Sequence, residues 1–501
     1  MSTEQQKQTY RSIVKSTAIF GGAQLVNAVI GVFRGKFVSI LLGVTGMSIL
    51  AIVYNAIAMI QQVGLMGLNQ SAVRSISAKN ESGDQEELEQ TLKIVRRLLT
   101  IAAFIAFIIM ILAAPVFSYT SFHRQFDYTW MFLLAAFVVF FNVKLSGEQS
   151  ILQGLRCYRQ YAQSSMAAPL AGLVIGVPIF YFWGRDGIVP SLIISAFITW
   201  IVTRWLCHKI EPAHKSTLRI TPRLLWKHGR SMIILGLALM LSSVLGTLSN
   251  YSIVAFISSF GKLADVGIYQ SALNITTQCS TMVFTAMAAD YYPQLSARLS
   301  KNKQHAFELV NQETEIVLLS IAPVACLLIM FAPTIVSILL TSEFAPVAPL
   351  LRCLAVALIF KACCFPMDYI ALAKGDTKYF FWTEGVCLNI KMFAIITSFY
   401  YFYGIDGLGY AAIVSGVTDL FFSIGLTRWR YGFKLKGANY LWLLGLLTLI
   451  AGVYAASFVS NPIVSYAIMG VLTGACCLWA VWQINKRAEL IKRVLNKLQR
   501  K

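Results

Sequence analysis

Charge is scarce in this chain. Asp, Glu, Lys and Arg fill only 13% of its 501 positions, whereas a soluble domain carries about 25% charged residues. This scarcity excludes an ordinary soluble domain. The ten cysteines include no Cys-x-x-Cys pair and there are only five histidines, so the sequence predicts neither a metal site nor a disulfide framework. It also lacks a nucleotide-binding glycine loop and a long polar domain, so we predict no catalytic residues, no bound cofactor and no enzymatic activity.

Apolar residues are abundant instead, at 57% of the chain. They form about fourteen segments of spanning length, which is about 20 residues each. The sequence therefore predicts an all-α polytopic membrane protein. The expected spans are 14–41, 46–73, 94–117, 129–152, 162–183, 187–206, 229–258, 266–290, 308–332, 347–373, 380–403, 407–428, 438–459 and 463–485.

The formal net charge of +20 follows the membrane topology rather than indicating a nucleic-acid partner. If the N-terminus is cytoplasmic, 33 of the 42 Lys and Arg residues fall in the inner segments. The outer loops hold only Arg124, Arg185 and Lys262. Because Lys and Arg concentrate on the cytoplasmic side of membrane proteins, we expect both termini to be cytoplasmic.

The chain repeats itself weakly. The turn GRDG at 184–187 recurs as GIDG at 404–407, an offset of 220, and Gly154 and Gly46 recur as Gly375 and Gly267 at an offset of 221. Parallel repeats of this kind occur in transporters whose binding site lies between two lobes. We therefore expect an N-terminal lobe at 1–206, a basic cytoplasmic linker at 207–228, a C-terminal lobe of six spans at 229–430, two extra helices within 431–485 and a basic cytoplasmic tail at 486–501.

Six basic residues interrupt the apolar segments. A Lys or Arg at the centre of a span costs about 2.5–3.5 kcal/mol, so six together would cost roughly 15–20 kcal/mol unless acids, water or an anionic cargo face them. A membrane protein that keeps so much positive charge at depth handles something negative. We predict a substrate site formed by most of these cations and three span asparagines: Arg34, Lys36, Lys144, Lys361, Lys391, Asn27, Asn250 and Asn274; Arg352 is the sixth cation.

Two alternatives remain for these cations. Three of them have an acid on the same helical face, in the couples Lys144–Glu148, Lys361–Asp368 and Glu384–Lys391, and each couple could neutralise itself. Lys36 could instead extend toward the outer membrane surface, because it lies about 200° from Arg34 around a helix.

Acidic residues within the spans are candidates for ion coupling or gating. Asp290 and Asp419 have no cation on their own helix, and either could instead partner Arg352 across helices. The complete set is Asp290, Asp368, Asp419, Glu148 and Glu384.

Several short motifs resemble those of the Wzx-type flippases, which translocate O-antigen and related lipid-linked oligosaccharides. They lie in order along both lobes, from about residue 12 to 430. The motifs are GK at 35–36 followed by LGVTG at 42–46, VGIYQ at 266–270, YPQLSARL at 292–299 and IALAK at 370–374. Among the intramembrane cations, only Lys36 matches a basic position of the family motif.

The resemblance implies a V-shaped, alternating-access transporter of the multidrug/oligosaccharidyl-lipid/polysaccharide exporter superfamily. The implied cargo is a polyprenyl-diphosphate-linked oligosaccharide, as on undecaprenyl diphosphate, moved from the cytoplasmic to the periplasmic leaflet of a bacterial inner membrane during lipopolysaccharide or related polysaccharide biosynthesis. The implied partners are this cargo, membrane lipids, a polysaccharide polymerase and glycosyltransferases. A proton or sodium gradient is the expected driver. The family often stops after twelve helices, so the extra pair here has no assigned role.

Three other functions remain open. A drug/cation antiporter of the same superfamily would present buried acids to its cargo, whereas the unpaired charge here is mostly basic. A membrane polysaccharide polymerase or glycosyltransferase would carry a long outer loop, whereas the longest ones here, about 118–128 and 333–346, are short. The third is a flippase of the same superfamily for lipid-linked peptidoglycan precursors, which the sequence distinguishes only weakly from an oligosaccharide flippase.

Overall fold

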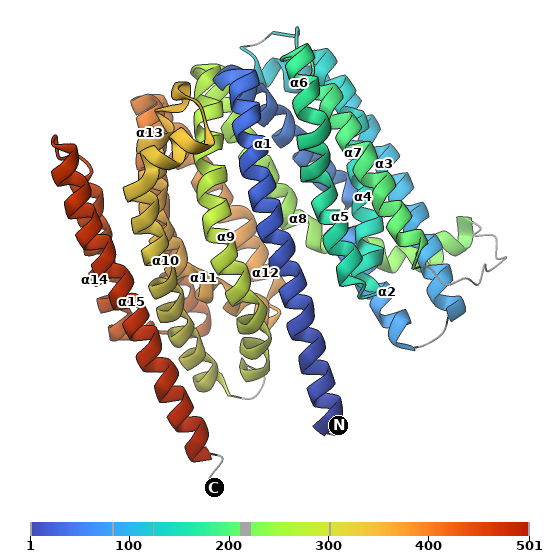
Figure 1. The fold of residues 1–501 in the computed structure, drawn as a ribbon. Coiled ribbons are helices and arrows are strands. Elements are labelled where there is room, and N and C mark those ends of the chain that lie inside the picture. Colours follow the sequence, from blue (N-terminus) through green and yellow to red (C-terminus); the bar gives the residue numbers. More distant parts are fainter. Residues whose placement is uncertain (1–2, 83–84, 124, 211–221, 300–301, 499–501) are drawn as a thin grey trace. The chain divides into compact units, whose positions relative to one another are not determined.

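A computed structural model describes residues 3–82, 85–123, 125–210, 222–299 and 302–498. Within these residues, every regular element is helical (Figure 1). Helices are expected in lipid because they satisfy all their backbone hydrogen bonds internally. The elements up to residue 260 are α1 (Thr3–Leu65), α2 (Leu68–Ser82), α3 (Gln85–Ser121), α4 (Thr129–Gly154), α5 (Tyr158–Ala171), the π-helix η1 (Gly172–Gly176), α6 (Val177–Trp183), α7 (Ile188–His208) and α8 (Pro222–Phe260).

The remaining elements follow in the same all-helical pattern. They are α9 (Leu263–Leu299), α10 (Lys303–Leu339), the 3-10 helix η2 (Ser342–Phe344), α11 (Val347–Lys374), α12 (Thr377–Phe380), the π-helix η3 (Phe381–Cys387), α13 (Leu388–Tyr431), α14 (Gly437–Ala456) and α15 (Pro462–Leu498).

The helices account for the predicted membrane spans. Eleven helical stretches of the described chain are long and apolar enough to cross a membrane. Two of them each hold two predicted spans, because α1 is interrupted at Gly43 and α13 at Gly404. The 37-residue α9 corresponds to the remaining one, 266–290. The chain is therefore a multi-pass membrane protein, and the all-α prediction with about fourteen spans is confirmed.

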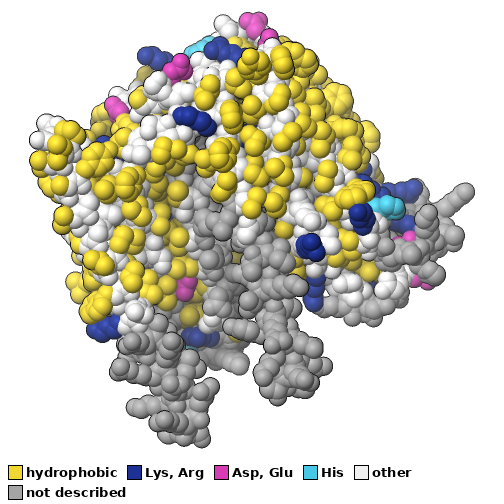
Figure 2. All heavy atoms as spheres, in the orientation of Figure 1, with side chains coloured by type: hydrophobic (Ala, Val, Ile, Leu, Met, Phe, Trp, Pro, Cys, Tyr) yellow, Lys and Arg dark blue, Asp and Glu magenta, His cyan; other side chains and the backbone are white. Residues whose placement is uncertain are grey.

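The outer surface of the helices suits lipid. Leu112 on α3 and Ile463 on α15 are 72% and 80% exposed, which would be costly for large apolar side chains in water. Figure 2 shows hydrophobic side chains over most of the described surface on this face. Contact with acyl chains removes the cost of leaving such side chains outside the core.

The chain forms two compact units. The first comprises residues 1–267 with 339–341, and the second comprises residues 268–338 with 342–501. In the first unit α4 packs between α3 and α7, and α1 packs against α5 and α8. In the second, α11 packs against α13 and α14, and α14 against α15. The spatial division thus falls near residue 267, whereas the sequence repeat places the start of the second lobe near 229; the repeat-based boundaries remain predictions.

The repeated turns share their backbone conformation. Gly184 and Gly404, 220 residues apart, both adopt a positive φ, 53° and 60°. Each turn has a second glycine three residues later, Gly187 or Gly407. A Cβ on Gly187 would press on the carbonyl oxygen of Ile179, and a Cβ on Gly407 would press on that of Phe399. Only glycine tolerates both conditions, so the weak sequence repeat marks two turns with the same geometry.

The other repeated landmark has shifted. In the second half the positive φ lies at Gly375, which ends α11. In the first half it lies at Arg156 (φ 58°), two residues after Gly154. Both halves nevertheless continue into a helix with a π-helical segment, η1 and η3.

The extra helices belong to the core of the second unit. Leu446 and Ile450 of α14 and Cys476 of α15 are fully buried in its apolar cluster. At the start of α14, the buried Asn439 amide donates to the backbone and side-chain oxygens of Asn311 on α10, at 2.9 and 3.0 Å. The α14–α15 pair is therefore fastened to the second unit by apolar packing and a buried amide pair.

We predict that Gly43→Ala destabilises the protein. Gly43 has φ 62° and ψ −172°, a region that is essentially restricted to glycine, so a Cβ there should cost about 1–3 kcal/mol. Thermal unfolding in detergent micelles should show a lower midpoint. Gly35→Ala on the same helix is the control, because Gly35 has open space around its Cα and should leave the midpoint nearly unchanged. Equal midpoints for the two variants would contradict the prediction.

Candidate functional site

Arg34 lies in a hollow within the first unit. The cavity has a volume of about 260 Å³ and receives residues from α1, α4, α5, η1 and α7. The guanidinium of Arg34 donates to the hydroxyl of Tyr54 at 2.9 Å. The other polar lining side chains are uncharged: Asn142, Ser195 and Thr199. No acidic residue is among those that line this hollow in the described chain.

A glycine makes room for this guanidinium. A Cβ on Gly172 would lie 2.8 Å from both Cζ and Nε of Arg34. Gly172 is the first residue of the π-helix η1. Such wide turns inside α-helices frequently occur at functional sites, because they displace the local backbone. The absence of a side chain at Gly172 therefore leaves the space that the Arg34 guanidinium occupies.

Asn27, also on α1, has an unmet hydrogen-bonding need. Its side-chain oxygen is buried and has no partner among the described residues. A buried acceptor without a donor costs about 1–3 kcal/mol. Asn27 lies seven residues before Arg34, hence nearly on the same helical face, so a ligand that reached both could supply the missing donor.

Lys36 is directed elsewhere. Its ammonium donates to the backbone carbonyl of Leu340, which the compact first unit includes. It is not among the residues that line the Arg34 hollow. The separation of Arg34 from Lys36 agrees with their angle around the helix. Leu340 lies in the expected outer loop 333–346, so the alternative that Lys36 extends toward the outer membrane surface stays open.

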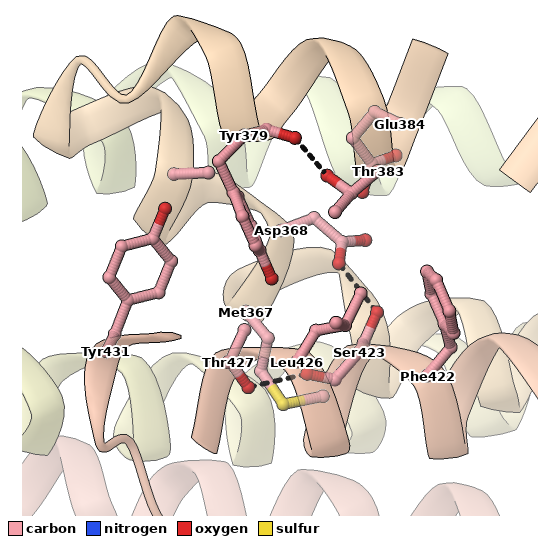
Figure 3. A pocket seen from close by; sticks show the side chains of 11 residues that line it. Met367, Asp368, Tyr379, Thr383, Glu384, Phe422, Ser423, Leu426, Thr427 and Tyr431 are labelled. Carbon is pink, nitrogen blue, oxygen red and sulfur yellow. Dashed lines mark hydrogen bonds between the residues drawn. The ribbon is translucent and has the colours of Figure 1, made fainter. Parts of the chain in front are cut away.

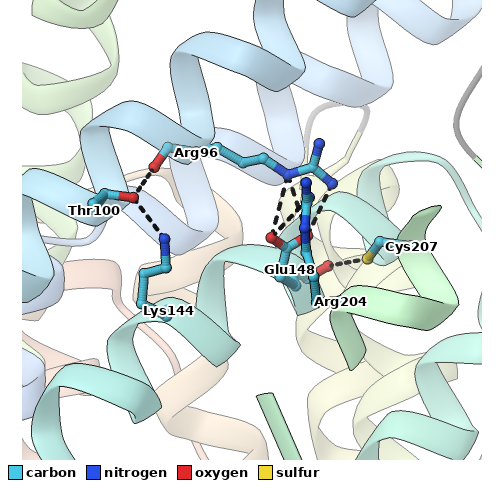
Figure 4. A network of polar contacts seen from close by, with 6 residues as sticks. All are labelled: Arg96, Thr100, Lys144, Glu148, Arg204 and Cys207. Carbon is cyan, nitrogen blue, oxygen red and sulfur yellow. Dashed lines mark hydrogen bonds and ion pairs between the residues drawn. The ribbon is translucent and has the colours of Figure 1, made fainter. Parts of the chain in front are cut away.

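In the described chain, Lys144 and Glu148 each have a hydrogen-bonding partner other than the one expected from the couple Lys144–Glu148. Glu148, 4% exposed, accepts hydrogen bonds from Arg96 of α3 (Nη2 to Oε2, 3.0 Å) and from Arg204 of α7 (Nη1 to Oε1, 3.2 Å). Lys144 instead donates to the Thr100 hydroxyl at 2.8 Å. Figure 4 shows Glu148 between the two guanidinium groups while Lys144 turns away. Glu148 thus ties three helices together, and its close ion pairs are with the two arginines.

In the second unit, the other two couples are rearranged. Lys391 forms an ion pair with Asp419 across the bend of α13, rather than with Glu384. Lys361 is not paired with Asp368; its ammonium lies 5.6 Å from the ring centroid of Phe284. The partner of Lys391 comes from beyond the bend of α13 and the ring beside Lys361 comes from α9, so spacing of a few residues along one helix could not reveal either.

One further expectation for a charged residue differs from the structure, and another falls on a residue whose side chain is not described. Arg352 does not partner Asp419, because its Nε donates to the carbonyl of Ile329 at 3.3 Å. The side chain of Asp290 lies outside the described residues.

A small cavity separates two of the predicted acids. It holds about 20 Å³, room for about one water molecule. Asp368 and Glu384 line it together with Tyr379, Ser423 and Thr427, and the Ser423 hydroxyl donates to Asp368 at 2.8 Å (Figure 3). Such a space is too small for a sugar but admits a species of the size of water.

A surface ion pair supports the tyrosine side of this cavity. Asp376, in the turn before α12, accepts from Arg430 (Nη2, 3.0 Å) and from the Tyr431 hydroxyl (3.4 Å). Its other oxygen accepts from the backbone N–H of Tyr379 at 3.4 Å. Burial alone would raise the pKa of the Asp376 carboxyl, but the Arg430 and Tyr379 hydrogen bonds outweigh it and lower that pKa below its ordinary value.

The two remaining asparagines are exposed. Asn250 lies on α8 in the first unit, and Asn274 lies on α9 in the second, where it accepts from Gln270 at 3.2 Å. Of the predicted substrate residues in the first unit, Arg34 and Asn27 share one helical face, while Lys36 and Lys144 have separate partners.

Several functional residues were missed by sequence reasoning. Tyr54 and Gly172 contact Arg34, and Arg96 and Arg204 hold Glu148. Arg96 and Arg204 stand at span ends, where they look like ordinary positive-inside residues. No local signal distinguishes Gly172 from the many other glycines of the spans.

We predict that Glu148→Gln is strongly destabilising. Removing the acid leaves two guanidinium groups around a buried neutral side chain, and breaking a buried pair in this way costs about 3–5 kcal/mol. Glu87→Gln is the control, because Glu87 and its partner Lys79 are 50% and 42% exposed and such a pair contributes at most about 1 kcal/mol. Thermal unfolding in the same detergent measures both. Similar losses for the two variants would contradict a structural role for Glu148.

Comparison with known proteins agrees with this architecture. The family model described as polysaccharide biosynthesis protein matches residues 41–349. No curated protein matches the sequence. Several solved structures share the fold, among them the following three. A lipid II flippase MurJ in an inward closed conformation has a TM-score of 0.70 at 13% identity, covering 94% of this chain and 99% of its own.

The other two structures are also transporters. An inward-facing multidrug resistance MATE family transporter of the MOP superfamily has a TM-score of 0.59 at 15% identity, covering 80% of this chain and 93% of its own. A MOP superfamily transporter from Pyrococcus furiosus has a TM-score of 0.57 at 16% identity, covering 82% and 94%. At these sequence identities, the matches show that this chain shares the fold of these transporters.

Proposed function

Because the chain belongs to the polysaccharide biosynthesis protein family, we propose that it is a flippase for polyprenyl-diphosphate-linked oligosaccharides. It would carry an O-antigen or similar repeat unit, linked to a lipid such as undecaprenyl diphosphate, from the cytoplasmic to the periplasmic leaflet of a bacterial inner membrane. Both termini would be cytoplasmic, as the Lys and Arg distribution indicates. The observation that carries the proposal is the Arg34 guanidinium in a hollow whose other polar lining groups are uncharged.

The charge of Arg34 calls for an anion. Its one hydrogen-bonding partner among the described residues is the neutral Tyr54 hydroxyl. A guanidinium presents five N–H donors in a planar fork that fits two oxygens of one phosphate. A diphosphate that entered the hollow would offset the burial cost of the cation.

The other lining residues suit the sugar part of such a cargo. Asn142 offers an amide, and Ser195 and Thr199 offer hydroxyls, which can bind sugar hydroxyls without adding charge. The fold is shared with a protein described as a lipid II flippase, which supports a lipid-linked cargo. A polymerase and glycosyltransferases are the expected partners, since they would use or supply this cargo.

A drug/cation antiporter is the second candidate, because MATE transporters share the fold. A cationic cargo needs an acid in its binding hollow. The hollow of the first unit presents Arg34 and no acid, which favours the anionic cargo.

We assign coupling to the second unit. Asp368, Glu384 and Asp419 lie there with Lys391, and the space between Asp368 and Glu384 admits only about one water-sized species. A proton fits this space better than a hydrated sodium ion. Glu148 is bound by two arginines, so we assign it to structure.

We predict that Arg34→Gln lowers flipping about 10- to 100-fold, the loss of one or two hydrogen bonds from a charged group. Reconstituted vesicles with a fluorescent polyprenyl-diphosphate oligosaccharide would measure the rate. Arg34→Lys should keep part of the activity, and Gly172→Val should impair it by displacing the guanidinium. Arg159→Gln, which removes an exposed charge at the start of α5, is the control. Normal flipping by folded Arg34→Gln would refute the site.

We predict that Asp419→Asn and Glu384→Gln each remove the stimulation of flipping by a pH gradient while leaving cargo binding intact. The reason is that each variant deletes a carboxyl that could release a proton: Glu384 lines the small cavity, and Asp419 is the ion-pair partner of Lys391. Flipping with and without an imposed gradient, together with cargo binding at equilibrium, separates the two effects. Asp186→Asn, in a turn between α6 and α7, is the control. Unchanged gradient stimulation in both carboxyl variants would refute the coupling assignment.

A further inference from the structure

A second hollow lies along the last two turns of α7. It has a volume of about 330 Å³ and is lined by Trp200, Ile201, Arg204, Trp205 and His208. These residues recur at intervals of about four, which places them along one stripe of the helix. Thr199, which lines the Arg34 hollow, is turned about 100° from Trp200 around the helix. The two hollows therefore use different faces of α7.

The hollow is lined by a cation, Arg204, and by a tryptophan, Trp200, whose indole N–H lies beneath its surface. Glu148 holds one side of the Arg204 guanidinium, as Figure 4 shows, while the Arg204 side chain stays 41% exposed. The indole N–H of Trp200 is buried and has no partner among the described residues. A buried donor without an acceptor is costly, so an incoming oxygen atom would be favoured beside it.

The position of the hollow corresponds to the headgroup level of a bilayer. The membrane span ends with α7 at His208. The ammonium of the next residue, Lys209, lies 3.5 Å from the ring centroid of Trp205. Tryptophans and basic residues gather where membrane spans meet water. Ile201 and Trp205, 44% and 55% exposed, add an apolar rim on the side of the span.

The local charge favours an anion. The six residues drawn in Figure 4 carry three cations, Arg96, Lys144 and Arg204, and one carboxylate. Lys144 also lies 5.6 Å from the ring centroid of Trp200. Basic pockets beside membrane spans bind the headgroups of acidic lipids.

We propose that the hollow formed by Trp200, Arg204, Trp205 and His208 binds the headgroup phosphate of an acidic phospholipid. Arg204 and the Trp200 indole donate to the phosphate oxygens, and Lys209 and His208 lie at the water side. Ile201 and Trp205 contact the first carbons of the acyl chains. This site is independent of the proposed flippase activity, since it uses another face of α7 and another kind of lipid.

Native mass spectrometry of the full chain in detergent tests the proposal with phosphatidylglycerol as the probe and phosphatidylcholine as the neutral comparison. Wild-type protein should retain phosphatidylglycerol preferentially, and higher salt should weaken this retention. Arg204→Gln should weaken it about fivefold, the typical contribution of one basic side chain near a lipid surface. Arg159→Gln should leave it unchanged.

Arg204→Gln also disturbs Glu148, so Trp200→Phe and His208→Gln provide tests that spare that pair. Trp200→Phe keeps an aromatic ring beside Phe141 and Phe197 but removes the indole N–H, and it should weaken retention at unchanged thermal stability. Equal retention of phosphatidylglycerol by wild type, Trp200→Phe and His208→Gln would overturn the proposal. Farnesyl diphosphate serves as the probe for the cargo. If Trp200→Phe or His208→Gln lost farnesyl diphosphate binding but kept phosphatidylglycerol, the hollow would belong to the cargo, and the proposal would also be overturned.

Discussion

The structure depends on how it compensates the charged side chains within its membrane spans, because the interior of a membrane solvates charge poorly. Glu148 is enclosed by two guanidinium groups from other helices, and Lys391 is paired with Asp419 across a bend. Both arrangements bring opposite charges together, which is the ordinary solution in a membrane. Arg34 departs from it, because a hydroxyl and a bare glycine surround its guanidinium. That departure is what connects the fold to an anionic cargo.

The two compact units differ in the sign of the charge they offer. The hollow of the first unit presents a guanidinium among amide and hydroxyl groups. The small cavity of the second presents two carboxyls and admits about one water molecule. Cargo binding in one unit and proton exchange in the other would follow from this difference. The extra helices α14 and α15 complete the apolar core of the second unit. They therefore contribute to its packing, whether or not they also take part in transport.

Local sequence patterns predicted the helices well because each span must satisfy its own backbone hydrogen bonds. The same holds for the turns at Gly184 and Gly404, where a positive φ selects glycine in both halves. The charge couples were predicted poorly. Lys144 and Glu148 share a helical face, yet the longer side chains of Arg96 and Arg204 reach Glu148 from neighbouring helices. Spacing along one helix cannot rank such partners.

The sequence by itself determined that the chain spans the membrane many times, where its spans lie and that it carries excess positive charge at depth. These properties depend on hydropathy and on residues close together in the chain. Only the tertiary structure decided which of the charges stays uncompensated. That choice depends on Gly172 leaving space beside Arg34 and on Asp419 meeting Lys391. Both are contacts between residues far apart along the chain, and in a low dielectric a difference of a few ångströms decides whether a charge is neutralised or left to attract a ligand.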